Sequence, residues 1–507
     1  MSDSFDPIAF ELFKNSLFSM TDDMALTIFR TTYSGVLKDN MDYSTGFADA
    51  EGKLVAQGLT LPGHLGSVPT ALASIMRHFG DDMGPGDVFI MNDPFDGGMH
   101  LPDIFIFKPL YHAGERLAFA CTVCHHTDVG GRVAGSNASD STEIYAEGLR
   151  IAPMKLYEAG KLNQTIMTFI EKNVRLPVQV FGDLRAQLAA CQKGIAELTA
   201  MAEHYGLPVV QAYMQHVQDN AEAAVRKVID VLKDGEYSYE MDNGAVVRVA
   251  IRIDHQRRAA TIDFTGTSAQ QSDNFNAPLP VTRAAVLYVF RTLVDDEIPM
   301  NAGCMKPLEL IVPEGSMLAP RYPAAVVAGN VETSQVVTDC LYGALGVLAA
   351  SQGTMNNFTF GDDVHQYYET ISGGSGAGPD FDGTDAVQTH MTNSRLTDPE
   401  VLEWRFPVRL ESFQIRRGSG GTGRYRGGDG VERRVRFLKP MTAVMLANHR
   451  RVAPFGVAGG KSAAVGRNWI ERAAGKAEHF DAAFSVRVER DDIIVIETPG
   501  GGGFGKS

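Results

Sequence analysis

The chain has 507 residues, of which 44% are hydrophobic and 21% are charged, a composition typical of globular proteins. Its 46 Lys and Arg against 61 Asp and Glu give a formal net charge of -15, which disfavours binding to nucleic-acid backbones. No segment reaches the roughly 20 consecutive apolar residues of a membrane helix, and the acidic start lacks the basic region of a signal peptide. We therefore expect a cytoplasmic protein that binds neither nucleic acid nor membrane and forms no disulfides.

The first half of the sequence alternates predicted helices with predicted strands. Asp6 followed by Pro7 is typical of a helix start, and apolar residues then recur at three- and four-residue spacing on a long helix. A hairpin signal follows before about residue 60, and residues 87–129 contain three strand-like runs. The pattern becomes helical over residues 163–233.

The second half becomes progressively richer in strands and glycine. Strands are predicted over 236–267 and helices near 281–294 and 333–351, and after about residue 355 alternating runs and glycine clusters predominate. The 52 glycines indicate many tight turns. We predict an α+β class, a mixed multi-layer fold with long N-terminal and central helices and a β-rich, Gly-rich C-terminal region. The predicted domains are an α+β domain with a helical segment at 1–235, an α/β region at 236–354 and a β-rich region at 355–507.

Three motifs match known patterns but lack the required context. The ending GGGGFGKS fits a P-loop, and residues 418–423 fit the dinucleotide pattern G-x-G-x-x-G, yet both patterns require a following helix. No helix is predicted after the second motif, and Ser507 ends the sequence. Residues 121–125 fit a haem attachment motif, which functions outside the cytoplasm and here falls in a predicted strand. We expect neither nucleotide nor haem on these motifs.

The segment 92–103, together with His125, contains residues that could bind a metal or act in catalysis. The segment 92–103 places acids and His100 among glycines and prolines, which predicts a shaped loop. If a hairpin turns near residues 113–114, Asp103 lies opposite His125, about 5 Å away at Cβ. His126 then faces the other way, so only one of these two histidines can join the group.

Two imidazoles and a carboxylate that converge on one point suit a divalent metal. Zinc, manganese and iron(II) all accept such a mixed nitrogen and oxygen donor set. The alternative is that the histidine–aspartate pairs only satisfy each other's hydrogen bonds. The residues alone leave both interpretations open.

Several long motifs follow one another along the chain. They are DNMDYSTGFAD at 39–49, NDPFDGGMHLPDI at 92–104, CHHTDVGG at 124–131, EGLRI at 147–151, GNVETSQVVTD at 329–339, THMTNSRLTDPE at 389–400 and TPGGGGFG at 498–505. With these motifs the chain resembles the hydantoinase B/5-oxoprolinase family over nearly its whole length. That family includes B subunits of ATP-dependent hydantoinases and lactamases, and large subunits of acetone and acetophenone carboxylases are related to it.

The resemblance implies one divalent metal held by His100, Asp103, His125 and Asp42, the last on resemblance alone. Zinc is the first expectation, with manganese or iron as alternatives. It also implies a hydantoinase A-like subunit that binds ATP and phosphorylates the carbonyl of a small cyclic amide, such as a hydantoin, 5-oxoproline or a lactam. Metal-bound water in this B subunit would then open the ring. The expected assembly is an A2B2 heterotetramer or a larger complex.

The resemblance leaves the general base open among His126, Asp96 and Glu147, any of which could instead orient a ligand. Glu332 and His390 are further candidates for substrate contact. Three arginines are expected to form structural ion pairs: Arg395, Arg405 and Arg416. Two other functions remain open, a subunit of an ATP-dependent acetone- or acetophenone-type carboxylase and a non-catalytic scaffold for an ATPase partner.

Overall fold

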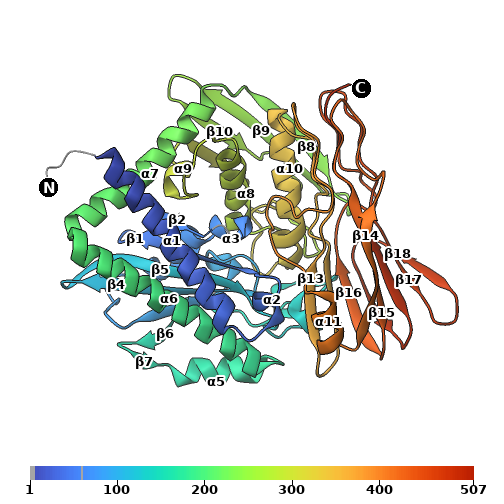
Figure 1. Ribbon diagram of the computed structural model, residues 1–507, viewed down its shortest axis with the longest axis horizontal. Coiled ribbons are helices and arrows are strands. Elements are labelled where there is room, and N and C mark those ends of the chain that lie inside the picture. The colour runs from blue at the N-terminus through green and yellow to red at the C-terminus, as the bar shows by residue number, and fades with distance from the viewer. Residues whose placement is uncertain (1–5, 59–60, 507) are drawn as a thin grey trace.

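The structure, a computed structural model, describes residues 6–58 and 61–506 and confirms the predicted α+β class (Figure 1). The helices are α1 (Pro7–Thr31), α2 (Gly35–Lys38), α3 (Pro62–Leu65), α4 (Val68–Phe79), α5 (Gln164–Asn173), α6 (Pro177–Tyr205), α7 (Leu207–Ile229), α8 (Leu279–Thr292), α9 (Ala302–Met305), α10 (Ser334–Leu345) and α11 (Pro399–Arg405). None of these helices is long and apolar enough to cross a membrane, as far as the described residues show. The cytoplasmic location stays a prediction.

A seven-stranded antiparallel sheet forms the centre of the N-terminal half. Its order is β2 (Leu54–Gln57), β1 (Tyr43–Asp49), β5 (Glu115–His125), β4 (Asp103–His112), β3 (Val88–Met91), β6 (Met154–Glu158) and β7 (Lys161–Leu162). Side chains alternate along β4, so that Ile104 and Ile106 join the hydrophobic cluster that contains α1 and α6. Phe105 and Phe107 point to the other face and join a second cluster with α4, α8 and α10. The central strands β4 and β5 are therefore buried on both faces over most of their length.

The predicted hairpin between β4 and β5 is confirmed in its register. Asp103 pairs with His125 across the two strands, and the turn lies at Ala113 and Gly114, which both have positive φ angles. The earlier hairpin is also confirmed, because β1 pairs antiparallel with β2. The alternation places Asp103 and His125 on the face of the sheet that carries Phe105.

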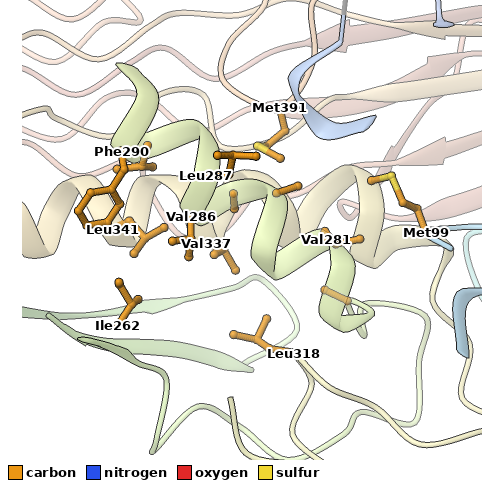
Figure 2. Close-up of a cluster of buried hydrophobic side chains, with 14 of the residues drawn as sticks. Met99, Ile262, Val281, Val286, Leu287, Phe290, Leu318, Val337, Leu341 and Met391 are labelled. Atoms are coloured by element: carbon orange, nitrogen blue, oxygen red, sulfur yellow. The ribbon is translucent and has the colours of Figure 1, made fainter. Parts of the chain in front are cut away.

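Helices α8 and α10 pack between the first sheet and a second, four-stranded one. That sheet has the order β11 (Leu308–Ile311), β10 (Ala259–Asp263), β9 (Val246–Asp254) and β8 (Gly235–Glu240). Figure 2 shows Val286 and Phe290 of α8 beside Leu341 of α10 above Ile262 of β10. This cluster contains side chains from all three predicted domains, and their boundaries stay predictions.

The β-rich C-terminal region is confirmed as two packed sheets. One has the order β13 (Gln366–Thr370), β12 (Asn357–Gly361), β16 (Met441–Leu446) and β19 (Phe484–Val488). The other has the order β14 (Val408–Arg416), β15 (Gly430–Phe437), β20 (Ile493–Glu497), β17 (Arg467–Glu471) and β18 (Ala477–Phe480). A third hydrophobic cluster fills the space between them. The helix predicted at 333–351 ends earlier, at Leu345, because Gly346 turns into the left-handed region.

The C-terminal glycines allow backbones to approach closely, in addition to forming turns. A Cβ atom at Gly427 would lie 1.8 Å from the carbonyl oxygen of Gly501. The amides of Gly501, Gly502 and Gly503 donate hydrogen bonds to carbonyl groups of neighbouring loops, so they are not directed at a phosphate. The segment 418–423 is likewise followed by loop and strand. The expectation that neither motif binds a nucleotide stays a prediction.

Candidate metal and active site

A small cavity opens where the first sheet meets the segments around α3 and α10. It has a volume of about 20 Å³, enough for one water molecule or one ion. Its lining residues come from eight parts of the sequence: Asp42, Leu61, Gly63, His64, His100, Asp103, His125, Asn330, Val331, Met355, Tyr368, Met391 and Thr392. The four residues that the family resemblance implies as metal ligands are all among them.

Each of these side chains is positioned by a distinct local feature. Asp42 directly precedes β1, and its carbonyl oxygen accepts a hydrogen bond from the backbone of His125 at the end of β5 (3.0 Å). His100 lies in the loop before β4, which the buried amide of Asn92 holds by donating to the carbonyl groups of Leu101 and Leu149. This loop brings His100 back toward the first residue of β4.

The ionisable groups form a chain of close approaches. His100 Nε2 lies 3.1 Å from Asp103 Oδ2, and His64 Nε2 lies 3.4 Å from Asp103 Oδ1 and 3.6 Å from Asp42 Oδ1. The rings of His100 and His125 have centroids 5.2 Å apart. All five side chains are buried. The cluster therefore combines three imidazoles with two carboxylates in a water-poor environment.

Burial and mutual charge shift the protonation of the cluster in opposite directions. Burial raises the pKa of Asp42 to about 6, although His64 partly opposes the change. Burial also opposes ionisation of Asp103, but His100 and His64 outweigh it and hold the pKa of Asp103 well below its usual range. Burial, reinforced by His100, lowers the pKa of His125 to about 3. At neutral pH His125 is thus a neutral imidazole with a free lone pair, as a metal ligand must be.

The cavity contains the kinds of donor atom that bind a divalent metal, although these atoms do not yet surround a common point. Both ring nitrogens of His100 and of His125, and Oδ1 of Asp103, are buried without a well-aligned hydrogen-bond partner within the described part of the chain. Such orphaned atoms are costly unless an ion or water satisfies them. Among the described residues, however, no three His, Cys, Asp or Glu side chains already surround a common point. The orphaned atoms of His100, Asp103 and His125 nevertheless all belong to residues that line the same cavity, where an ion could satisfy them.

Uncharged residues complete the cavity. Tyr368 of β13 stacks on the ring of His125, with centroids 4.5 Å apart, and its hydroxyl accepts a hydrogen bond from Asn357 (2.7 Å). Asn330 donates to Asp103 Oδ2 (3.4 Å) from a π-helical turn, Gly329–Thr333, directly before α10. Single π-helical turns occur frequently at functional sites.

Comparison with known proteins shows the family to which the chain belongs. A sequence model of hydantoinase B/oxoprolinase proteins matches residues 6–507. The chain belongs to the hydantoinase B/oxoprolinase family. A 5-oxoprolinase from Dictyostelium discoideum is 40% identical over 99% of this chain, and 5-oxoprolinase 1 from Arabidopsis thaliana is 39% identical over 99%. The chain spans only about two fifths of the length of these relatives, 40% and 42%.

Two solved structures share the architecture. An ATP-dependent caprolactamase from Pseudomonas jessenii superimposes with a TM-score of 0.90 at 27% identity, covering 99% of this chain and 92% of that one. A nucleotide-free acetone carboxylase also gives a TM-score of 0.90, covering 99% of this chain and 76% of that one. Its 18% identity shows a common fold and nothing more.

None of the three residues expected to be candidate bases lines the cavity, and two of them point to other parts of the structure. His126 faces the opposite side of the sheet, where its Nε2 lies 3.0 Å from Gln187 Oε1 of α6. Asp96 accepts hydrogen bonds from Ser74 and Arg77 of α4. The strand alternation that aims His125 inward necessarily aims its neighbour outward.

The third candidate base, Glu147, is buried, and its hydrogen bonds hold a segment that lies beside the cavity. Its carboxylate accepts hydrogen bonds from the amides of Val326 and Val327 and from the hydroxyl of Ser141. It does not line the cavity. Its contacts hold the segment that leads into the turn carrying Asn330.

The two candidates for substrate contact and the three arginines expected in ion pairs also lie outside the cavity. Neither Glu332 nor His390 lines the cavity. Glu332 accepts a hydrogen bond from the amide of Met355, and His390 Nε2 lies 3.0 Å from Asp339 Oδ1. Arg405 pairs with Asp39 and Arg416 with Glu497, which confirms two of the three expected ion pairs. The third expectation is wrong, because the exposed Arg395 has no ion pair within the described residues and lines a separate surface groove.

Sequence reasoning missed three members of the site: His64, Asn330 and Tyr368. The only local signal for His64 is its position between Gly63 and Gly66, and isolated histidines of this kind are common in protein cores. Asn330 and Tyr368 reach the cavity from segments more than 200 residues away from His100. No local pattern marks such residues.

Proposed function

We propose that this chain is the hydrolytic, B-type part of an ATP-dependent cyclic amide hydrolase. The observation that carries the proposal is the buried His and Asp cluster with orphaned donor atoms, in a family whose relatives include 5-oxoprolinases and, among solved structures, a caprolactamase. Hydantoins, 5-oxoproline and lactams share an amide inside a ring, whose resonance makes the carbonyl a poor electrophile.

One divalent metal would be held by Asp42, His100, Asp103 and His125, with zinc first and manganese or iron as alternatives. Bound there, it would act as a Lewis acid and lower the pKa of a coordinated water. The residues around it keep bulk water out, and the low pKa of His125 keeps this ligand neutral. The ionised Asp103 offers negative charge to a cation and accepts a hydrogen bond from Asn330.

ATP use requires a second component in this proposal. The amides of Gly501, Gly502 and Gly503 in the glycine-rich terminal segment already donate hydrogen bonds to carbonyl groups of neighbouring loops, which supports ATP binding elsewhere. The chain also corresponds to about two fifths of the length of the 5-oxoprolinases. A hydantoinase A-type, ATP-binding subunit would supply the missing part and phosphorylate the ring carbonyl, in an A2B2 or larger complex. The general base is left open.

The test combines reconstitution with metal analysis. We expect the 507-residue chain, purified with an A-type ATP-binding subunit, to contain about one divalent metal and to open a cyclic amide only when ATP is present. His100→Ala should lose metal and activity while the chain remains folded, as judged by circular dichroism. Full activity of this variant, or of the metal-free complex, would refute the catalytic role of the site. A bicarbonate requirement without ring-opened product would instead indicate a carboxylase.

A further inference from the structure

His64 is the third imidazole of the cavity, and the family resemblance gives it no role. It lies on the short helix α3 and is buried. Its Nδ1 is 3.2 Å from the hydroxyl of Ser44, while Nε2 faces the carboxylates of both Asp42 and Asp103. One ring nitrogen is thus engaged by a hydroxyl and the other points between the two acids.

We propose that His64 is a positioning residue that holds the Asp42 and Asp103 carboxylates in place for metal binding, and that contacts running back to α10 hold His64 itself. The inference rests on the proposed metal site. If Nε2 of His64 carries the hydrogen and donates a hydrogen bond to the carboxylates, it has no lone pair left for a metal. Nδ1 is already engaged by the Ser44 hydroxyl, so this role excludes His64 as a ligand. Residues that orient metal-binding carboxylates in this way are commonly required for tight binding.

The first link in the path that holds His64 is a close backbone contact. The amide of Gly63 donates to the carbonyl oxygen of Met391 (3.1 Å), and a Cβ atom at Gly63 would lie only 2.9 Å from that oxygen. The residue before His64 must therefore be small for this approach. Met391 itself also lines the cavity.

The second link fixes Met391 to the core through its neighbour. His390 has a φ of 54°, and its Nε2 lies 3.0 Å from Asp339 Oδ1 in α10. Asp339 also accepts hydrogen bonds from the amide and hydroxyl of Ser351, so its carboxylate is held on several sides. One helical turn earlier in α10, Gln335 donates to the carbonyl group of Thr389 (2.9 Å). The segment beside His64 is thus anchored to α10 at two successive residues.

The test measures metal affinity without relying on activity. Zn²⁺ affinity of the full chain would be measured by competition with a chromogenic chelator for wild type, His64→Gln, His64→Ala and His390→Ala. We expect His64→Ala to bind Zn²⁺ about 10- to 100-fold more weakly. His64→Gln, whose amide can still donate near the carboxylates, should recover part of this loss. His390→Ala should weaken binding in the same direction although it touches no ligand.

A matched control comes from another histidine–aspartate pair. His365 lies 3.0 Å from Asp362 at the turn between β12 and β13, and His365→Ala should leave Zn²⁺ affinity unchanged. X-ray absorption of the Zn²⁺-loaded wild type and His64→Gln should show the same number of imidazole ligands. Loss of one imidazole in the variant, or unchanged affinity in His64→Ala, would overturn the inference while the metal site stands. Failure of the wild-type chain to bind Zn²⁺, Mn²⁺ or Fe²⁺ would refute the proposed site together with this inference.

Discussion

The buried carboxyl of Glu147 offers a sharp test of how the site is supported. Its Oε1 accepts hydrogen bonds from Val326 N (3.0 Å), Val327 N (3.0 Å) and Ser141 Oγ (2.8 Å). Glu147→Ala would leave the two amides without this partner, at about 1–3 kcal/mol each, or about 2–6 kcal/mol together. Glu147→Gln keeps an oxygen in the same place and should be much less destabilising.

The same residue predicts a pH dependence of stability. Burial raises the pKa of Glu147 to about 7, against a usual value near 4.5. Because the folded-state pKa is raised, the stabilising effect is complete below about pH 4.5 and is lost as the pH rises through 7. The shift corresponds to about 3 kcal/mol, at 1.36 kcal/mol for each pH unit. Glu147→Gln cannot titrate, so its free energy of unfolding should change less than that of wild type between pH 5 and pH 8.

Urea unfolding at pH 5, 6, 7 and 8 provides the measurement, because the difference between wild type and Glu147→Gln isolates this one group. Glu143→Gln is a suitable control, since Glu143 is exposed in the same segment. Parallel pH curves for wild type and Glu147→Gln would refute the raised pKa. Equal stability of Glu147→Ala and Glu147→Gln would refute the role of its hydrogen bonds.

Three further predictions concern other parts of the molecule. Arg433 and Glu369 form a buried bidentate ion pair at 2.7 and 2.8 Å, and Arg433→Ala should lower the free energy of unfolding in urea by about 3–5 kcal/mol; a loss below 1 kcal/mol would contradict this. Gly427→Ala should destabilise the chain by at least about 1–3 kcal/mol, because the contact with the Gly501 carbonyl oxygen leaves no space for a methyl group. Gly84 lies in open space, so Gly84→Ala should not destabilise the chain. Similar unfolding midpoints for the two variants would argue against close packing at Gly427. His125→Ala should abolish stoichiometric zinc in elemental analysis while circular dichroism stays unchanged, and retained zinc would exclude this residue as a ligand.

Features that depend on local periodicity could be predicted well. The apolar stripe of α1, the β4–β5 hairpin and the pairing of Asp103 with His125 follow from spacing within one segment. The strand period also explains why His125 and His126 separate to opposite faces. The interpretation of His126 and Asp96 as candidate bases came instead from their presence in shared motifs, and shared motifs do not show which way a side chain points.

Membership of the cavity depends on contacts between distant segments, which local patterns cannot specify. His64, Asn330 and Tyr368 meet the predicted residues only because the first sheet, α10 and β13 pack together. The burial that raises the pKa of Asp42 and lowers that of His125 has the same origin. Residue type and spacing therefore identify which groups can do chemistry, whereas long-range packing fixes their neighbours, their exclusion from water and their charge.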